Sequence, residues 1–281
     1  MLLFVCSGNT CRSPMAEALY NHITGGTNAI SAGIYADSLS CASPYAIKAV
    51  EKYGANLSGH LSKPLTSNIL ARCSLIITMT AAQKNYLLSI TNIPVMTLAE
   101  YAGETFDIQD PYGASQEIYD RCAAQISSCI KKGLILSSVR RAVKQDAEKI
   151  AELEKECFPD PWGPVSIQER IEKNGVAVYE KDSIVLGYCI FSEAADEGEI
   201  YRIAVSESVR KKGIGSALIK YVIHKMKIDL VQQIYLEVRS LNKAAITLYE
   251  KSGFKKAGIR EKYYSDNGEN AFIFYFDLKE R

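Results

Sequence analysis

Residues 5–14 read VCSGNTCRSP, and this stretch decides the fold of the first half of the chain. It continues the apolar run of residues 2–5, which predicts a buried strand. Ser13 and Pro14 suit the N-cap and the first position of a helix, so we expect a strand, a short loop and a helix in succession. A helix N-terminus attracts phosphate and favours a cysteine thiolate. The stretch therefore predicts a phosphate-binding loop with a nucleophile, Cys6, at its base.

The loop between the strand and the helix carries groups that can converge on one anion. Taken alone, Cys6 would be interpreted as a core cysteine and Arg12 as a surface residue. The order of nucleophile, loop glycine, arginine and helix start favours catalysis over that interpretation. The residues expected to surround the phosphate, besides Cys6 and Arg12, are Ser7, Gly8, Asn9, Thr10, Cys11 and Ser13.

This loop resembles that of the low molecular weight protein tyrosine phosphatases, and residues 15–18 (MAEA) continue the resemblance. That family needs an acid in a downstream Asp-Pro turn, and Asp110 followed by Pro111 matches it, although an Asp before Pro also commonly starts a plain turn. The resemblance implies that Cys6 attacks phosphorus to form a phosphocysteine. Arg12 would hold two equatorial oxygens, and Asp110 would protonate the leaving group and then activate water. No cofactor is expected for this reaction.

The same resemblance gives roles to four further loop residues. Ser13 would donate a hydrogen bond to the thiolate, and Asn9 would hold the strained loop. Thr10 replaces the bulky aliphatic residue of many tyrosine phosphatases and is typical of the protein-arginine-phosphatase branch. Phosphoarginine is therefore the first expected substrate, and phosphotyrosine is the alternative. Cys11 is either a packing residue or the partner of Cys6 in a reversible disulfide, and both possibilities stay open.

Charge density divides the chain into two parts. Residues 1–136 hold 18 Lys, Arg, Asp and Glu, whereas residues 137–281 hold 47. Both parts are near neutral, so the difference predicts two separate domains, 1–136 and 137–281, rather than a polyanion-binding surface. The first domain alternates strand-like and helical segments, which predicts an α/β fold with a doubly wound parallel sheet. The expected strands are 2–5, 29–32, 75–79 and 95–97, and the expected helices are 14–23, 44–53, 81–89 and 116–132, ending before Gly133.

Several classes of protein are excluded by composition. The eight cysteines form no C-x-x-C pair and no metal-binding spacing, so we expect reduced thiols, no metal and a cytoplasmic location. The first strand begins at residue 2, which leaves no room for a targeting segment. No apolar run approaches the ~20 residues of a membrane span, and no direct nucleic-acid binding is expected.

A second motif follows the predicted strand 199–205. Residues 210–215 read RKKGIG and precede a segment with apolar residues at helical spacing. Glycines at such a turn let backbone N–H groups approach a pyrophosphate, although a basic turn is more often a solvated surface. The residues of this expected site are Arg210, Lys211, Lys212, Gly213, Ile214, Gly215 and Ser216.

The downstream segments, YLEVRSLN at 235–242, AAITLYE at 244–250 and Gly-Phe at 253–254, resemble the GNAT acetyltransferases. Within them the chain is most similar to the RimI-type enzymes, which acetylate the N-terminal alanine of small-subunit ribosomal protein eighteen. The resemblance implies an α+β GNAT domain that uses acetyl-CoA. Glu237 would be the general base and Tyr249 the general acid. The backbone of Ile203, Ala204 and Val205 would hold the acetyl carbonyl, and Asn242 would contact the pantetheine arm.

Other interpretations of the second domain stay open. Glu237 could pair with Arg239 on the same strand face, and Tyr249 could be a core aromatic. The domain could act on another amine, or one of the two domains could be catalytically silent and regulatory. The leading expectation is a bifunctional enzyme whose partners are phosphorylated proteins and a ribosomal protein N-terminus.

Overall fold

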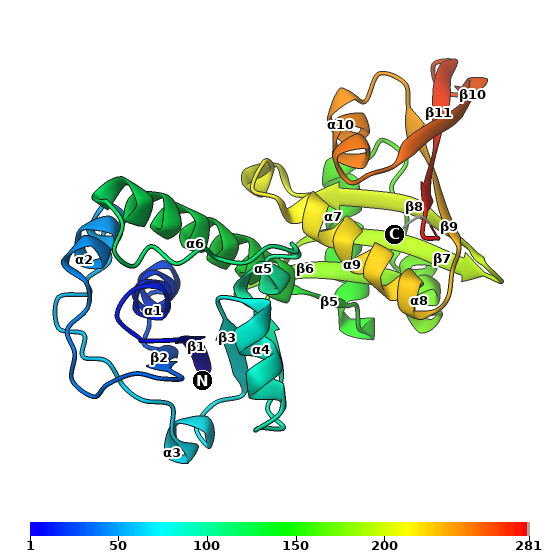
Figure 1. Cartoon of the computed structure of the whole chain (residues 1–281). Coiled ribbons are helices and arrows are strands. Elements are labelled where there is room, and N and C mark those ends of the chain that lie inside the picture. The colour runs from blue at the N-terminus through cyan, green and yellow to red at the C-terminus, as the bar shows by residue number, and fades with distance from the viewer. Residues whose placement is uncertain (280–281) are drawn as a thin grey trace. The chain divides into compact units, whose positions relative to one another are not determined.

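The computed structural model describes residues 1–279. The chain forms two compact units, Met1–Leu134 and a second unit that begins at Ile135. Each unit has its own sheet and its own hydrophobic core (Figure 1). We therefore describe each unit by itself.

The first unit is built on a four-stranded parallel sheet of order β2-β1-β3-β4. The loop of residues 7–11 leaves the carboxyl end of β1, which is a central strand, and this is where parallel α/β sheets bind ligands. The strands are β1 (Leu2–Cys6), β2 (Ala29–Gly33), β3 (Leu75–Thr78) and β4 (Val95–Thr97), and the helices are α1 (Arg12–Thr24), α2 (Pro44–Glu51), α3 (Ser67–Leu70), α4 (Ala81–Leu88), α5 (Leu98–Tyr101) and α6 (Gln116–Ser137).

Alternate residues of β1 face two separate layers of helices. Phe4 and Cys6 pack in a core with residues of α1, α2 and α6, whereas Leu3 and Val5 pack with residues of α3 and α4. This alternation follows from the two-residue period of a strand. The predicted doubly wound parallel fold is confirmed.

Two predicted helix ends are wrong, each for a local reason. Helix α1 begins at Arg12, with Cys11 at its N-cap, because the Ser13 hydroxyl bonds the Cys6 sulfur instead of capping the helix. Helix α6 does not stop before Gly133 but continues to Ser137. A side chain at Gly133 would lie 2.1 Å from the ring of Tyr101. The glycine therefore lets the Tyr101 ring of α5 pack directly against α6.

The second unit is built on a seven-stranded sheet of order β10-β11-β9-β8-β7-β6-β5. All neighbouring strands run antiparallel except β8 and β9, which run parallel. The strands are β5 (Val139–Arg141), β6 (Val176–Lys181), β7 (Ile184–Ala194), β8 (Glu197–Val205), β9 (Gln233–Arg239), β10 (Lys255–Tyr264) and β11 (Glu269–Asp277). The helices are α7 (Ala147–Cys157), α8 (Pro164–Glu172), α9 (Ile214–Ile228) and α10 (Lys243–Lys251), and single 3₁₀ turns cover Lys144–Asp146 and Glu207–Val209.

Helices cover both faces of this sheet (Figure 1). Residues of α9 and α10 share one core with Ile234, Leu236 and Val238 of β9. Residues of α7 and α8 share another core on the opposite face. The mixed sheet with helices on both faces confirms the GNAT-like fold expected for this half.

The parallel pair β8 and β9 separates part-way along its length. The last paired residues are Ile200 and Leu236. Beyond them β8 pairs only with β7, and β9 pairs only with β11, within the described residues. The facing backbone edges of residues 201–205 and 237–239 are therefore free to bond a ligand in the gap between them.

Residues 1–279 contain neither a candidate membrane span nor a candidate metal cluster. No helix in this part of the chain is long and apolar enough to cross a membrane. The described residues also contain no cluster of three or more His, Cys, Asp or Glu side chains that could hold a metal ion.

Candidate active sites

Cys6 ends β1, and its sulfur is surrounded by hydrogen-bond donors. Its Sγ lies 3.0 Å from the Ser13 hydroxyl and accepts a hydrogen bond from the Asn9 backbone N–H at 3.3 Å. The thiol belongs to a buried side chain at the N-terminus of α1. Donors of this kind and a helix N-terminus both stabilise a thiolate, which is the nucleophilic form of cysteine.

Asn9 holds the loop in shape with every polar atom that it has. Its φ is 52°, a left-handed conformation that is uncommon outside glycine. Its side-chain amide donates to Ser13 at 3.0 Å and to Ser31 at 2.9 Å, while its Oδ1 accepts from the Lys63 backbone N–H at 2.9 Å. His60 Nε2 bonds its carbonyl at 2.9 Å. These bonds offset the backbone strain and keep the loop N–H groups turned inward.

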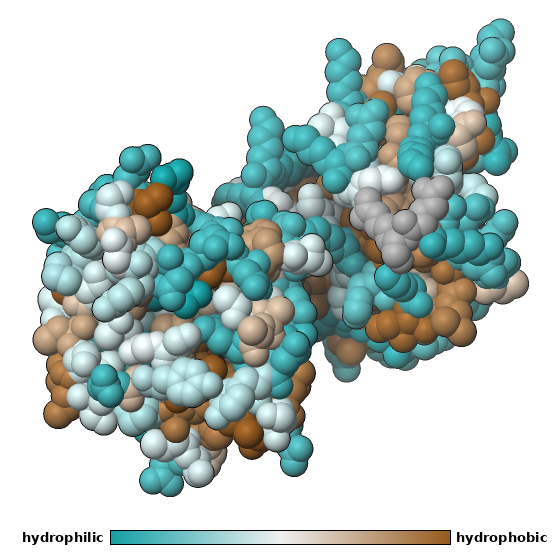
Figure 2. Space-filling view, in the orientation of Figure 1, coloured by the Kyte–Doolittle hydropathy of each residue, from teal (hydrophilic) through white to brown (hydrophobic). Residues whose placement is uncertain are grey.

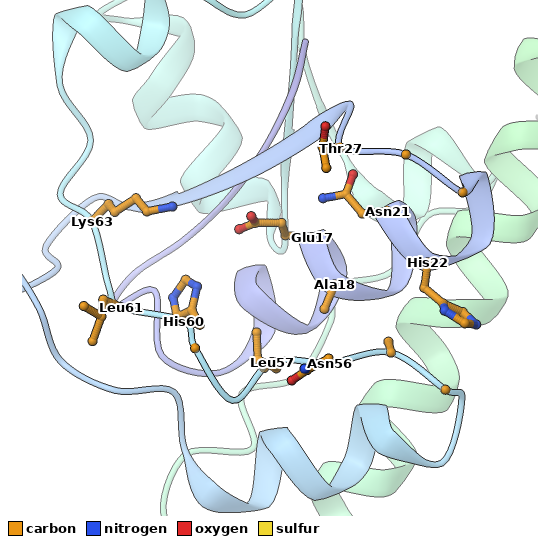
Figure 3. Close-up of a pocket in the computed structure, with 15 residues that line it drawn as sticks. Glu17, Ala18, Asn21, His22, Thr27, Asn56, Leu57, His60, Leu61 and Lys63 are labelled. Carbon is orange, nitrogen blue, oxygen red and sulfur yellow. The ribbon is translucent and has the colours of Figure 1, made fainter.

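His60 and Lys63, which bond to Asn9, also line a groove (Figure 3). Figure 3 shows the side chains of Glu17, His60 and Lys63 pointing toward one another across it. Ser31 donates to Glu17 at 2.6 Å, so a hydrogen-bonded chain runs from Asn9 to this carboxylate. Burial lowers the pKa of His60 below its ordinary value of 6.5. None of residues 6–13 lines this groove, so it does not lie over the Cys6 sulfur.

Arg12 and Asp110 complete this site. The guanidinium is almost fully buried, and it donates to the Ile108 carbonyl at 3.0 Å and to the Asp110 carboxylate. Its Nε is buried without a partner among the described residues. Because a buried N–H without an acceptor is costly, this atom is suited to a phosphate oxygen. The Ile108 carbonyl occupies one terminal nitrogen of the guanidinium. The two nitrogens that can bind a phosphate are therefore Nε and the terminal nitrogen that contacts Asp110.

Two other loop residues have partners of their own. Cys11 Sγ lies 3.2 Å from the hydroxyl of Tyr119, and burial raises the pKa of the Cys11 thiol. Both Cys6 and Cys11 are free thiols in this structure. The Thr10 hydroxyl lies 3.7 Å from the Cys11 sulfur, and the Thr10 side chain is half-buried.

In the second unit, Glu237 and Tyr249 lie on opposite faces of the sheet. Glu237 is the first residue of β9 after the strands separate, and it faces away from the core that contains Leu236 and Val238. Tyr249 of α10 lies in that core, where its ring packs against Phe274. Burial raises the pKa of the Tyr249 hydroxyl, which keeps it protonated.

The partners of the Glu237 carboxylate are Arg260 and Tyr263. Its Oε1 lies 2.7 Å from Arg260 Nε, and it accepts a hydrogen bond from the Tyr263 hydroxyl. The alternative in which Glu237 pairs with Arg239 is not found among the described residues, because Arg239 bonds Asp266 at 2.9 Å and Glu269 at 3.4 Å.

The loop before α9 has the features of a phosphate-binding site. Gly213 is its N-cap with φ 90° and no side-chain cap, so the N–H groups of Ile214, Gly215 and Ser216 lack intrahelical partners. A side chain at Gly215 would lie 3.1 Å from the end of the Leu248 side chain, so α9 packs closely against α10 at this position. Lys211 has φ 62° and, like Lys212, is exposed. These residues fit the pyrophosphate of a CoA thioester.

Arg210 and Asn242 are already engaged by the protein. The Arg210 guanidinium donates to the Val205 carbonyl at 3.0 Å and to Glu207 at 3.0 Å, so it anchors the loop. The Asn242 side chain caps α10 by accepting from the Ala245 backbone N–H at 3.1 Å. Ile203, Ala204 and Val205 lie on the stretch of β8 that pairs with β7 but no longer with β9.

Each half of the chain matches an enzyme family. Residues 1–148, more than half of the chain, match the family described as low molecular weight phosphotyrosine protein phosphatase. Residues 147–254 match the GNAT acetyltransferase family. The chain belongs to both enzyme families.

Individual relatives cover one domain each. A candidate ribosomal protein bS18-alanine N-acetyltransferase of Bacillus subtilis is 33% identical over 147 residues, which are 51% of this chain and 97% of the relative. The protein-arginine-phosphatase of Bacillus subtilis is 36% identical over 140 residues, covering 47% of this chain and 92% of that one. A candidate low molecular weight protein-tyrosine-phosphatase of Ralstonia nicotianae is 41% identical over 114 residues, covering 40% and 77%. The chain is thus a fusion of a low molecular weight phosphatase with a GNAT acetyltransferase.

The sequence alone assigned no role to three residues that lie near these sites. In the phosphatase domain, Gln83 donates to the Ser7 hydroxyl at 3.2 Å, and in the acetyltransferase domain Arg260 and Tyr263 contact Glu237. Gln83 follows β3, whose carboxyl end lies beside that of β1, so the strand order gives the signal for it. Arg260 and Tyr263 depend on a hairpin register that the sequence does not reveal.

Proposed function

We propose that the phosphatase domain hydrolyses phosphoarginine in proteins through a phosphocysteine. The Cys6 thiolate attacks phosphorus, Arg12 binds the equatorial oxygens, and the leaving nitrogen takes a proton from Asp110. Asp110 then removes a proton from the water that attacks the phosphocysteine, which releases phosphate and restores Cys6. The unpartnered, buried Nε of Arg12 is the observation that carries this role, because it points to an anion at the loop.

The choice of phosphoarginine rests on Thr10 and on the protein-arginine-phosphatase relative. A hydroxyl can accept a hydrogen bond from a guanidinium N–H, which an aliphatic side chain cannot do. Phosphotyrosine is the second candidate, because a tyrosine-phosphatase relative is 41% identical over 114 residues and the rings of Tyr35 and Tyr112 are exposed. Exposed aromatic rings of this kind suit an aryl ester.

Turnover of matched peptides carrying phosphoarginine or phosphotyrosine tests the substrate. We expect higher kcat/KM for phosphoarginine in the native enzyme, and a shift toward phosphotyrosine in Thr10→Ile. Cys6→Ser and Asp110→Asn should lose activity on both peptides while acetyl transfer continues. A native preference for phosphotyrosine would replace the first candidate by the second.

We further propose that the second domain transfers the acetyl group of acetyl-CoA to an N-terminal alanine of a ribosomal protein of the bS18 kind. Acetyl-CoA supplies an acetyl thioester when it is bound. Glu237 accepts the proton that the α-ammonium of the acceptor must lose before the amine attacks. Tyr249 gives a proton to the departing thiolate sulfur. This proposal is supported by the position of Glu237 directly after the point where β8 and β9 separate, with Tyr249 on the other face of the sheet.

Transfer to an alanine-initiated peptide tests these roles. Glu237→Gln keeps the size of the side chain but removes the base, so it should abolish transfer and leave acetyl-CoA binding intact. Phosphatase activity of the same variant is the internal control. Undiminished transfer in Glu237→Gln would refute the assignment.

A further inference from the structure

The acetyltransferase domain contains a cation already bonded to the proposed general base. Arg260 Nε lies 2.7 Å from Glu237 Oε1, and the Arg260 side chain is 55% exposed. Among the described residues, Arg260 is the cation that pairs with Glu237, since Arg239 is held by Asp266 and Glu269. The acceptor amine reaches the enzyme as an ammonium, so it must meet the same carboxylate.

The sheet register explains how Arg260 reaches Glu237. Arg260 pairs with Ala271 of β11, and Ala271 pairs in turn with Arg239 of β9. Glu237 lies two residues from Arg239 and therefore points to the same face. Ala271 is fully buried, and its small side chain lets the guanidinium pass over β11 to the next strand.

An irregularity in β10 adds Tyr263 to this cluster. The register of β10 against β11 shifts between Arg260 and Tyr264, and Lys262 has φ 50° there. Such a bulge re-aims the side chains beside it. The Tyr263 hydroxyl donates to Glu237, which raises the pKa of this tyrosine, and the Arg260 guanidinium lies 5.3 Å from the Tyr263 ring centre.

The cluster is open to solvent, so its ion pair can exchange partners. Figure 2 shows hydrophilic and hydrophobic residues side by side on the hairpin of β10 and β11. Glu237 is 23% exposed, and Tyr263 is 46% exposed. A half-exposed ion pair is weak, because water screens it and its long side chain gains freedom on release. A second cation can therefore displace Arg260 at small cost.

We propose that Arg260 competes with the acceptor ammonium for Glu237 and thereby sets the affinity of the acetyltransferase for its amine acceptor. The inference rests on the proposed role of Glu237 as the base. While Arg260 is paired, the carboxylate offers little net charge to an amine. When the acceptor binds, its ammonium takes the place of the guanidinium, which moves into solvent. Arg260 is thus a specificity-determining residue that makes no contact with the acetyl group.

The test is the steady-state kinetics of Arg260→Met with an alanine-initiated peptide. Removing the competitor should lower KM for the peptide by about two- to fivefold, the range of an exposed ion pair. The kcat should stay at or below the native value, because tighter binding of substrate alone does not accelerate the chemical step. KM for acetyl-CoA should be unchanged. Arg260→Lys, which keeps a cation on the same strand, should return KM toward the native value.

Lys262→Met is the matched control, because it removes one exposed positive charge from the same strand. It should leave KM for the peptide unchanged. A raised peptide KM in Arg260→Met would show that Arg260 binds the acceptor directly, and an unchanged KM would show that it does not compete; either result overturns the proposal. Full activity in Glu237→Gln would instead overturn the proposed base, so the two failures are distinguishable.

Discussion

Gly33 of β2 lies so close to the phosphate-binding loop that a side chain there would collide with loop atoms. A β-carbon at this position would lie 2.7 Å from the Ser7 carbonyl oxygen, 2.7 Å from the Ala36 side chain and 3.0 Å from the Asn9 side chain. Ordinary contacts of a β-carbon begin at 3.4 Å, and values below 3.0 Å are essentially never seen. Gly33→Ala therefore requires a movement of about 0.3–0.7 Å between β2 and the loop.

The movement should fall on the loop rather than on the strand. Gly33 is fixed by its pairing with Cys6 in the sheet and by a backbone hydrogen bond to the Lys63 carbonyl at 2.9 Å. A misplacement of ~1 Å in a catalytic group costs on the order of 100-fold in rate, so we expect kcat/KM of the phosphatase to fall by about 10- to 100-fold. The variant should also lose about 1–3 kcal/mol of unfolding free energy, as overpacked sites do.

The assay is phosphatase kcat/KM, measured well below the melting temperature of the variant. Acetyl transfer by the same sample serves as the internal control and should not change. Gly59→Ala is the matched variant, because a β-carbon there meets no atom within 4 Å. Native phosphatase activity in Gly33→Ala, or an equal loss in Gly59→Ala, would refute the reasoning.

Three further predictions concern buried groups. Gly133→Ala puts a methyl group 2.1 Å from the Tyr101 ring and should destabilise the phosphatase domain by about 1–3 kcal/mol, as measured by thermal unfolding. His60 resists protonation in the folded state, so the phosphatase domain should lose stability as the pH falls below 6.5, where the unfolded chain binds the proton; urea unfolding across that range measures it. Glu154→Gln leaves the guanidinium of Arg202 without its buried carboxylate and should cost the acetyltransferase domain about 3 kcal/mol in chemical denaturation.

Each of these has its own control. Gly59→Ala, in open space in the same domain, should be neutral beside Gly133→Ala, and a stabilised Gly133→Ala would contradict the steric argument. His60→Gln should flatten the pH dependence, and an unchanged slope in that variant would assign it to other groups. The phosphatase transition should not move in Glu154→Gln; a native midpoint for the acetyltransferase domain would show that the buried pair contributes nothing.

Local sequence determined the chemistry of each loop. The order of Cys6, Arg12 and the start of α1 depends on neighbours along the chain, so the first motif could be identified from ten residues. The same holds for the glycines before α9 and for the N-cap at Asn242. Periodicity predicted the strands of the first sheet to within a residue or two, because each strand is short, apolar and followed by a turn.

Tertiary structure alone decided the partners of those residues. Gly133 lies inside α6 instead of past its end, because the ring of Tyr101, which is distant in the sequence, packs against it. The pairing of Glu237 with Arg260 depends on the register of two hairpin strands and on a bulge between them. A strand face follows from a two-residue period, but what lies across the sheet from it follows only from how the strands are paired.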